Sequence, residues 1–543
     1  MDQEQLKTLL DKNTEHFPRV LRKFNEENAD LFQFEKFHKN DLWFSLWKAV
    51  FGILNDDGLE KYHTVCLNTI RILSRDESSL LKNNIVPDIS CLLKLAHLVA
   101  SGGTNMAATT PDAIDQSYNT DVVVEALKCL CNLVFQNVEV RRECIRQNVA
   151  DVIFQRLSSS TQTESSIELF DMKLLFLVTA LDTTVRSRVL IELNGLTYLT
   201  ELLDEKFRVT SEFSAQQFDV AIELLKVMFN ITSSSDKSPS ENEIQSLHLT
   251  SVIREILIRF SDMKTDRERS VIAHSIDLLT NISSSCLSEL IVKCDSTAKS
   301  TEKRPIFECR NVSALSTVLR YLHYTLEENE KSSSTNKNLV TPVLAILVKC
   351  ISSNSIMRRY VRSVILPPLR DVYKRPEEGN ELRNYLCRLQ GSPDLVVRNL
   401  TYELLLVCCK KNQSRLIKYF GYGNMAGLFA NAGLMAGRKV ETNEFSSEGE
   451  DSDTPEYNDM RHAINPVVGC YVPPTPNPLD NMTEEQKEYE AEKLVNLVDQ
   501  LHRGGIIQPC RINAEGKPEP VDHILELQEE LPKQHDLHKN AKE

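Results

Sequence analysis

The chain has 543 residues and a formal net charge of −14, with 41% hydrophobic and 26% charged residues. An acidic balance argues against general nucleic-acid binding. No apolar run reaches the roughly 18 residues that a membrane-spanning helix requires, so membrane insertion is not expected. Fourteen cysteines occur without a C-x-x-C spacing or histidines at metal-ligand distance, and the first residues lack the basic and apolar regions of a signal peptide. We therefore expect a cytosolic protein with reduced cysteines, no metal and no cofactor.

The first hundred residues are predicted to form helices. Apolar residues recur on one helix face from Leu42 to Leu54, and a second apolar helix is expected from His63 to Arg75. Within this second helix Arg71 and Arg75 are four residues apart. Residues with that spacing project from the same side of a helix.

Three later apolar helices carry an asparagine near their ends, at Asn132, Asn230 and Asn281. The first two are 98 residues apart and the last two are 51 apart, and a similar helix without asparagine lies midway, around residues 177–182. A helical unit recurring about every 50 residues indicates an all-α fold, an armadillo/HEAT-type α-solenoid superhelix. We expect this superhelix to occupy residues 1–430.

These asparagines are candidates for a peptide-binding groove. Lys128 and Lys226 each lie one helical turn before an asparagine. Together with the two arginines they would offer donors to a helical peptide and its terminal carboxylate. Two alternatives stay open: asparagine ends helices well because it tolerates the left-handed conformation, and the basic residues are ordinary solvated charges.

The character of the chain changes after residue 430. Residues 431–482 form an acidic, serine- and proline-rich segment that is predicted to be a disordered linker. Thr483 and Gln486 then make a capping box, which predicts an amphipathic tail helix over residues 483–502 and a flexible tail over 503–543. The apolar face of the helix comprises Leu494, Leu497, Val498 and Leu501.

A basic group stands out against the acidic chain. It contains Arg358, Arg359 and Arg362. One interpretation is a solvated helix face, and the other is a docking site for an acidic segment, including the chain's own.

No enzyme signature is present. The chain lacks the phosphate-binding, nucleophile-elbow, zinc-protease and kinase motifs. The glycines from Gly421 to Gly427 have one residue too many for a dinucleotide-binding loop and follow a helix rather than a strand. A turn that caps the solenoid is the favoured interpretation.

Three tail motifs resemble the C-terminal region of the synembryn family. They are Asn465-Pro-Val-Val-Gly469 with the prolines up to Pro478, the helix from Met482 to Asn496, and Ile506-Ile-Gln-Pro509. The resemblance extends to residues 66–76, 125–135 and 419–435, and so spans most of the chain.

The resemblance implies a cytosolic chaperone and guanine-nucleotide exchange factor for heterotrimeric G-protein α subunits. The groove residues would then bind the C-terminal helix of the α subunit, and the tail helix would contact its nucleotide-binding domain. By position, an acidophilic kinase would modify Ser447 and Ser452. The alternative is an armadillo-repeat scaffold that binds extended peptides without exchange activity.

Overall fold

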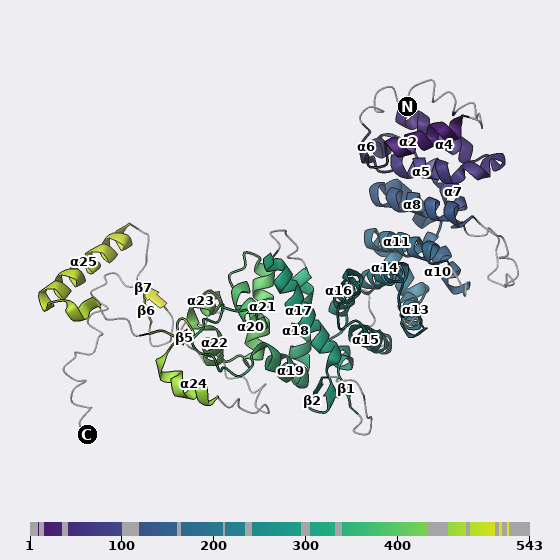
Figure 1. Ribbon diagram of the computed structural model, residues 1–543. Coiled ribbons are helices and arrows are strands. Elements are labelled where there is room, and N and C mark those ends of the chain that lie inside the picture. The colour runs from purple at the N-terminus through teal and green to yellow at the C-terminus, as the bar shows by residue number, and fades with distance from the viewer. Residues whose placement is uncertain are drawn as a thin grey trace. The chain divides into compact units, whose positions relative to one another are not determined.

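The computed structural model describes residues 16–34, 42–99, 119–159, 164–209, 212–233, 242–294, 305–331, 339–431, 454–473 and 478–504, with Leu9 and the short strands 510–512 and 518–520. The chain divides into two compact units, residues 1–357 and 358–543. Helices dominate both units (Figure 1), which confirms the predicted all-α class. No helix of the described residues is long and apolar enough to cross a bilayer.

The first unit is built around a row of helices that pack on one another in series. Helix α5 packs on α8, α8 on α11, α11 on α14, α14 on α16, and α16 on α18 (Figure 1). The members of this first row are α5 (His63–Leu73), α8 (Thr120–Gln136), α11 (Ser165–Leu181), α14 (Ala215–Thr232), α16 (Asp266–Thr280) and α18 (Val340–Ser353).

A second row of helices packs against the first, one helix to each repeat. Its members are α7 (Val86–Leu95) on α8, α10 (Val149–Ser159) on α11, α13 (Gly195–Val209) on α14, α15 (Asn242–Arg259) on α16, and α17 (Ser313–Lys331) on α18. Further elements belong to the same unit: α2 (Phe17–Glu27), α4 (Leu42–Leu54), η2 (Asp57–Tyr62), α6 (Glu77–Lys82), α9 (Val138–Arg146), α12 (Thr183–Ser187), η4 (Arg188–Glu192) and η5 (Cys286–Leu290).

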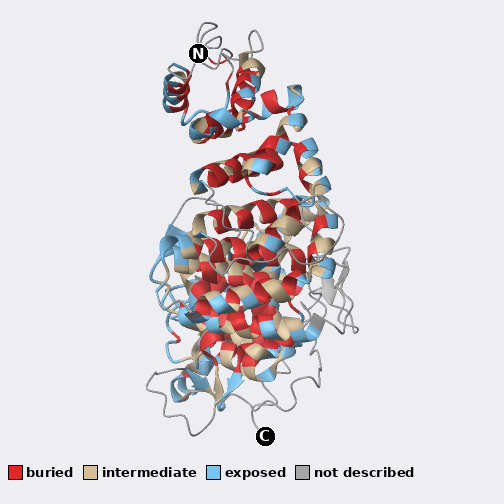
Figure 2. Cartoon of the chain, turned by 90° about the vertical axis from the view of Figure 1, so that its right-hand side faces the viewer, coloured by how far each residue is buried: buried red, intermediate tan, exposed pale blue. Residues whose placement is uncertain are grey.

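The apolar pattern of each first-row helix explains this packing. In α8 the residues Leu127, Leu130 and Leu133 are fully buried, and their three-residue spacing places them on one face of the helix. Asn137 ends α8 and caps α9, accepting hydrogen bonds from the amides of Glu139 and Val140. Figure 2 shows the buried residues running along the stacked helices, with exposed residues in the connections. The repeats therefore share one continuous core.

A small sheet interrupts the second row. Strand β3 (Arg310–Asn311) lies between β1 (Val292–Lys293) and β2 (Ile306–Phe307), and both neighbours are antiparallel to it. Glu308 and Cys309 form the turn between β2 and β3, each with positive φ. The sheet leads directly into α17.

The second unit contains a further group of helices, α19 (Ser355–Ile365, from Arg358 onward), α20 (Leu382–Leu389), α21 (Leu395–Cys408), α22 (Gln413–Phe420), α23 (Tyr422–Asn431) and α24 (Pro455–Met460). Its other elements are η8 (Arg461–Ala463), the hairpin β4 (Ile464–Asn465) and β5 (Cys470–Tyr471), η9 (Pro478–Asn481), α25 (Glu484–Arg503), and the pair β6 (Cys510–Ile512) and β7 (Pro518–Pro520).

Part of the predicted linker differs from expectation. Residues 454–473 pack on the second unit: the Thr454 hydroxyl donates to the carbonyl of Leu369, and the Tyr471 amide donates to the carbonyl of Val372 at 2.8 Å. The composition of this segment is polar, but its backbone groups find partners on other elements. This part of the predicted linker is therefore attached to other elements of the second unit, contrary to the prediction from its composition.

The sequence suggested that the glycine-rich segment at Gly421 is a turn that caps the solenoid, but this turn joins α22 to a further helix, α23. Gly421 ends α22 with φ +74°. The amides of Tyr422 and Gly423 donate to the carbonyls of Pro466 and Val467, each at 2.8 Å. The Asn465–Gly469 motif thus lies directly against the backbone of the Gly421 turn.

Candidate binding face

The three asparagines make the same contact at three repeat boundaries. Each side-chain amide donates to a backbone carbonyl on the preceding first-row helix and to a hydroxyl three residues further along. Asn132 reaches the Arg71 carbonyl at 3.3 Å and the Ser74 hydroxyl at 3.0 Å. Asn230 reaches Phe176 and Thr179, each at 3.1 Å.

Asn281, at the end of α16, makes the same contact with α14. Its side-chain amide donates to the Phe229 carbonyl at 3.0 Å and to the Thr232 hydroxyl at 3.1 Å. Asn132 and Asn230 lie inside α8 and α14, and Asn281 ends α16 with a φ of −86°, so the left-handed conformation explains none of the three. Their amide hydrogens are used within the chain, which means that they hold neighbouring repeats together. Within the described residues their Oδ1 atoms accept no hydrogen bond, so these half-buried side chains offer acceptors rather than the donors we expected.

Two glutamates that the sequence analysis did not single out form ion pairs with three of the predicted basic residues. Glu125 on α8 accepts from Arg71 Nε at 3.1 Å and from Lys128 Nζ at 2.6 Å. Glu223 on α14 pairs with Lys226 at 3.0 Å. Both glutamates precede a lysine by three residues, so the shared E-x-x-K pattern was a visible signal.

Arg75 differs from expectation because α5 ends at Leu73. It therefore lies beyond the helix rather than one turn along it from Arg71. Its guanidinium donates to the carbonyl of Ala29 and lies 5.4 Å from the ring centre of Phe32. Burial and the neighbouring Arg71 charge lower the pKa of Arg75. The two arginines consequently belong to different local clusters.

Helix α11, the repeat without an asparagine, contributes aromatic rings. Phe170 lies between the ammonium groups of Lys128 and Lys173, at 5.3 and 4.9 Å from its ring centre. Phe176 lies 5.6 Å from the ammonium of Lys226. Over the described part of the chain, Lys173 has no carboxylate partner and no hydrogen bond. We call the surface formed by Arg71, Glu125, Lys128, Asn132, Phe170, Lys173, Phe176, Lys226, Asn230 and Asn281 the first-row face.

Lys349 extends the series of contacts between repeats into α18. Its ammonium donates to the carbonyls of Thr280 and Ile282, both at 2.8 Å, and so caps the end of α16. Burial lowers the pKa of Lys349. Lys349 thus joins two first-row helices at this boundary, as the asparagines do at the earlier boundaries. The pattern of asparagines in the sequence could not indicate this contact, because the residue is a lysine.

The basic group on α19 is less open than the sequence implied. Arg358 and Arg362 are only 9% and 8% exposed, whereas Arg359 is half-buried. Burial, followed by the nearby charge of Arg415, lowers the pKa of Arg362. Ser447 and Ser452 lie outside the described residues.

The tail segment forms helix α25, Glu484–Arg503. Thr483 caps α25 with Gln486 in a reciprocal capping box, and the helix continues to Arg503. Leu494 and Leu497 are 61% and 53% exposed, and Val498 and Leu501 are half-exposed. No described residue of α25 is buried, so its apolar face is not covered.

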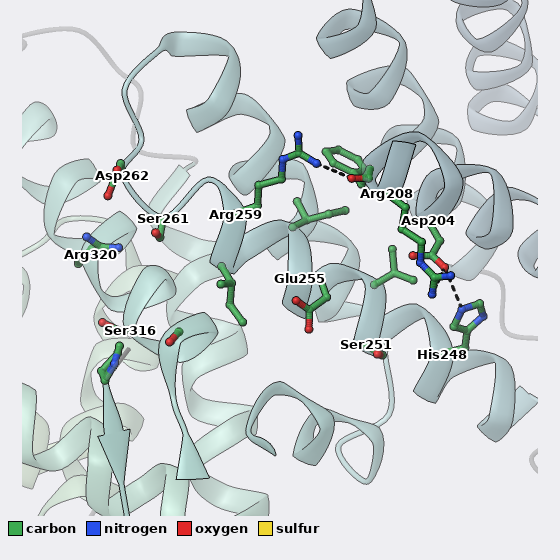
Figure 3. A pocket seen from close by; sticks show the side chains of 16 residues that line it. Asp204, Arg208, His248, Ser251, Glu255, Arg259, Ser261, Asp262, Ser316 and Arg320 are labelled. Atoms are coloured by element: carbon green, nitrogen blue, oxygen red, sulfur yellow. Dashed lines mark hydrogen bonds and ion pairs between the residues drawn. The ribbon is translucent and has the colours of Figure 1, made fainter. Parts of the chain in front are cut away.

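A cavity of about 900 Å³ lies among α13, α15 and α17, away from every predicted site residue. Figure 3 shows its charged lining, in which Asp204 pairs with Arg208 at 2.8 Å and lies 4.0 Å from His248. At the other end of the view Arg320 lies near Ser316 and Asp262. Elsewhere in the lining Arg259 donates to the carbonyl of Phe207. No sequence motif indicated this cavity.

The sequence profile described as "Guanine nucleotide exchange factor synembryn" matches residues 66–517. A "Chaperone Ric-8" from Drosophila pseudoobscura pseudoobscura is 50% identical, covering 98% of this chain and 99% of the relative. A "Chaperone Ric-8A" from Xenopus tropicalis is 36% identical, covering 96% of each chain. A "Chaperone Ric-8A" from Rattus norvegicus is 35% identical over 94% of this chain and 93% of the relative.

Proposed function

Because this chain belongs to the synembryn family of guanine nucleotide exchange factors, we propose that it acts on the α subunits of heterotrimeric G proteins. It binds the C-terminal helix of the α subunit on the first-row face, promotes release of GDP and stabilises the nucleotide-free state. By binding an incompletely folded α subunit on the same face, the protein also acts as a folding chaperone. Its place of action is the cytoplasm, including the cell cortex.

The chemistry of the first-row face supports this proposal. A helix that ends in a free carboxylate needs cations, acceptors for its side-chain donors, and apolar contact. Lys173 supplies an ammonium next to the Phe170 ring, and no carboxylate among the described residues pairs with it. The Oδ1 atoms of Asn132 and Asn230 supply acceptors on α8 and α14, the two first-row helices on either side of α11. The position of Lys173 beside an aromatic ring, without a carboxylate partner in the described part of the chain, is the observation that carries the assignment.

Exchange requires no nucleotide site on this chain. A protein that binds the nucleotide-free α subunit better than the loaded one must weaken GDP binding by the same factor, because the two equilibria are linked. Holding the C-terminal helix on the first-row face removes it from its packed position in the α subunit. The mechanism is therefore differential binding, without covalent chemistry.

The tail helix supports a second contact. Its apolar face is exposed along Leu494, Leu497, Val498 and Leu501. An uncovered apolar face on a helix is suited to a partner groove. We assign this face to the nucleotide-binding domain of the α subunit, where it stabilises the open state.

Regulation by an acidophilic kinase is part of the proposal. Phosphates on Ser447 and Ser452 add charge and strong acceptors to a segment that ends at Thr454. Thr454 is attached to Leu369, in the same unit as Arg358, Arg359 and Arg362. Arg359 is the most accessible of the three arginines. Docking of the phosphates there would restrict where α25 emerges and raise its local concentration near a bound α subunit.

The test is an exchange assay with purified α subunit loaded with GDP. Adding the full chain should accelerate uptake of a labelled GTP analogue. A scaffold without exchange activity would bind the α subunit and leave the uptake rate unchanged. Repeating the assay across α subunits of different subfamilies identifies the partners.

A further inference from the structure

Two cysteines outside the first-row face lie opposite each other in the small sheet. The register of β1 and β3 pairs Val292 with Asn311 and Lys293 with Arg310. Continuing that register by one position brings Cys294 opposite Cys309. The backbone confirms the pairing, because the Cys294 amide donates to the Cys309 carbonyl at 2.9 Å.

This placement meets the distance requirement of a disulfide. Directly opposed residues of an antiparallel pair have Cα atoms about 4.5–5.5 Å apart. Disulfide-linked cysteines have Cα atoms about 4.4–6.8 Å apart. Cys309 also lies in the turn after β2, with a φ of +58°.

The two thiols are also unusually accessible for this chain. Cys309 is exposed and Cys294 is half-buried, whereas the other described cysteines are buried except for the half-buried Cys131. Burial raises the pKa of Cys66 and of Cys350 to about 12, so thiols of that kind stay protonated and react slowly.

We propose that Cys294 and Cys309 are a redox modification site. A low-molecular-weight disulfide such as oxidised glutathione oxidises the two thiols, which then form a reversible intramolecular disulfide with each other. One protein thiolate attacks glutathione disulfide, which breaks the S–S bond and releases one glutathione thiol. The second protein thiolate then attacks the mixed disulfide and releases the second glutathione thiol. The protein loses two hydrogens and two electrons, and glutathione gains them.

The disulfide would change the wall of the cavity that lies among α13, α15 and α17. Pro305 lines that cavity and lies between the two cysteines in the sequence, and Ser313 and Ser316 line it from α17 just beyond. A disulfide would join Cys294, which follows β1, to the turn between β2 and β3, four residues from Pro305. The cavity is therefore the part of the fold whose access the oxidation state would alter.

Peptide mapping of the full chain tests the proposal. Trypsin cuts after Lys293, Lys299, Lys303 and Arg310, so the two cysteines leave in separate peptides, residues 294–299 and 304–310. After treatment with oxidised glutathione we expect these peptides as one linked species, two hydrogens lighter than their sum, that separates on reduction. Cys144→Ser, which removes a buried thiol, should leave the yield unchanged.

Cys309→Ser and Cys294→Ser should each abolish the linked species and leave a glutathione adduct on the remaining cysteine. Both positions lie at the sheet rather than in the helical core, and an unchanged far-UV circular dichroism spectrum checks the fold. Separate glutathione adducts on Cys294 and Cys309 in the unmutated chain, or linkage of either residue to another cysteine, would overturn the assignment.

Discussion

The Nε of Arg71 lies 3.1 Å from the Oε2 of Glu125, so that an ion pair joins α5 to α8. The other oxygen of the same carboxylate accepts from Lys128 at 2.6 Å. Glu125 is 16% exposed, and its two cationic partners are about a third exposed. A ligand carboxylate that approaches this cluster must compete with Glu125, whereas at Lys173 it meets no such competitor among the described residues.

The first prediction concerns the carboxylate site. Lys173→Ala should weaken binding of a free-acid peptide of the Gα C terminus about tenfold or more, because a charge-assisted hydrogen bond contributes roughly 1.5–3 kcal/mol. Binding of the same peptide with an amidated C terminus should change little. Isothermal titration with both peptides measures the difference, and equal losses for both would contradict a carboxylate contact.

The second prediction concerns the arginines. Arg71→Ala with Arg75→Ala should weaken α-subunit binding at least tenfold while the far-UV helical signal is kept. Arg142→Ala is the matched control, because Arg142 forms an exposed ion pair with Glu139 within α9. If the double variant is folded and binds as tightly as the control, the arginines are not part of the binding face.

The third prediction concerns the contacts between repeats. Asn230→Ala removes two hydrogen bonds to α11 and should lower the free energy of unfolding by roughly 1–3 kcal/mol. Asn55→Ala removes only a bond to the residue's own helix, from an exposed side chain, and should cost less. Urea unfolding of both variants measures the comparison. If the Asn230 variant is as stable as the Asn55 variant, the hydrogen bonds from Asn230 to α11 contribute nothing to stability.

The fourth prediction concerns pH. Asp171 on α11 is fully buried beside Arg156, and burial raises its pKa to about 6 despite the opposing arginine charge. Because the folded-state pKa exceeds the unfolded value near 4, the folded chain binds more protons between these values, and stability attributable to Asp171 falls as pH rises from about 4 to 6. Thermal melting of Asp171→Asn across this window should show a shallower decline than the unmutated chain. Parallel curves would contradict the shift.

The fifth prediction concerns the tail. Ending the chain at Asp480 removes α25, which has no buried residue, so the remaining fold should keep its melting temperature. The shortened chain should still bind the C-terminal Gα peptide but lose much of its exchange rate on the full α subunit. An undiminished exchange rate would mean that the helix plays no part in nucleotide release.

The repeating architecture was predictable because apolar residues recur at helical spacing and asparagines mark three of the units, those of α8, α14 and α16. The capping box at Thr483 likewise depends on residues three apart, which sequence displays directly. The role of the asparagines was harder, because their hydrogen-bond partners lie about 50 residues earlier. Arg75 was misplaced because α5 stops at Leu73, and helix ends are the least certain part of such predictions.

Pairs that depend on long-range packing were out of reach. Nothing local connects Glu125 with Arg71 across 54 residues, although E-x-x-K predicts the Glu125–Lys128 pair. Lys349 replaces an asparagine at its boundary with different chemistry, so a search by residue type could not find it. The attachment of residues 454–473 uses backbone groups, which every residue has and which therefore leave no compositional trace.

The meeting of Gly421 and Gly469 has a consequence for how this protein can vary. A Cβ added to Gly421 would lie 2.9 Å from the Gly469 nitrogen, and one added to Gly469 would lie 2.8 Å from the Gly421 nitrogen. Most steric conflicts in a core can be relieved by shrinking the opposing side chain, but here both partners are already as small as a residue can be. A change at either glycine has no compensating change at the other, so the tail and the last helices can vary around this point but not at it.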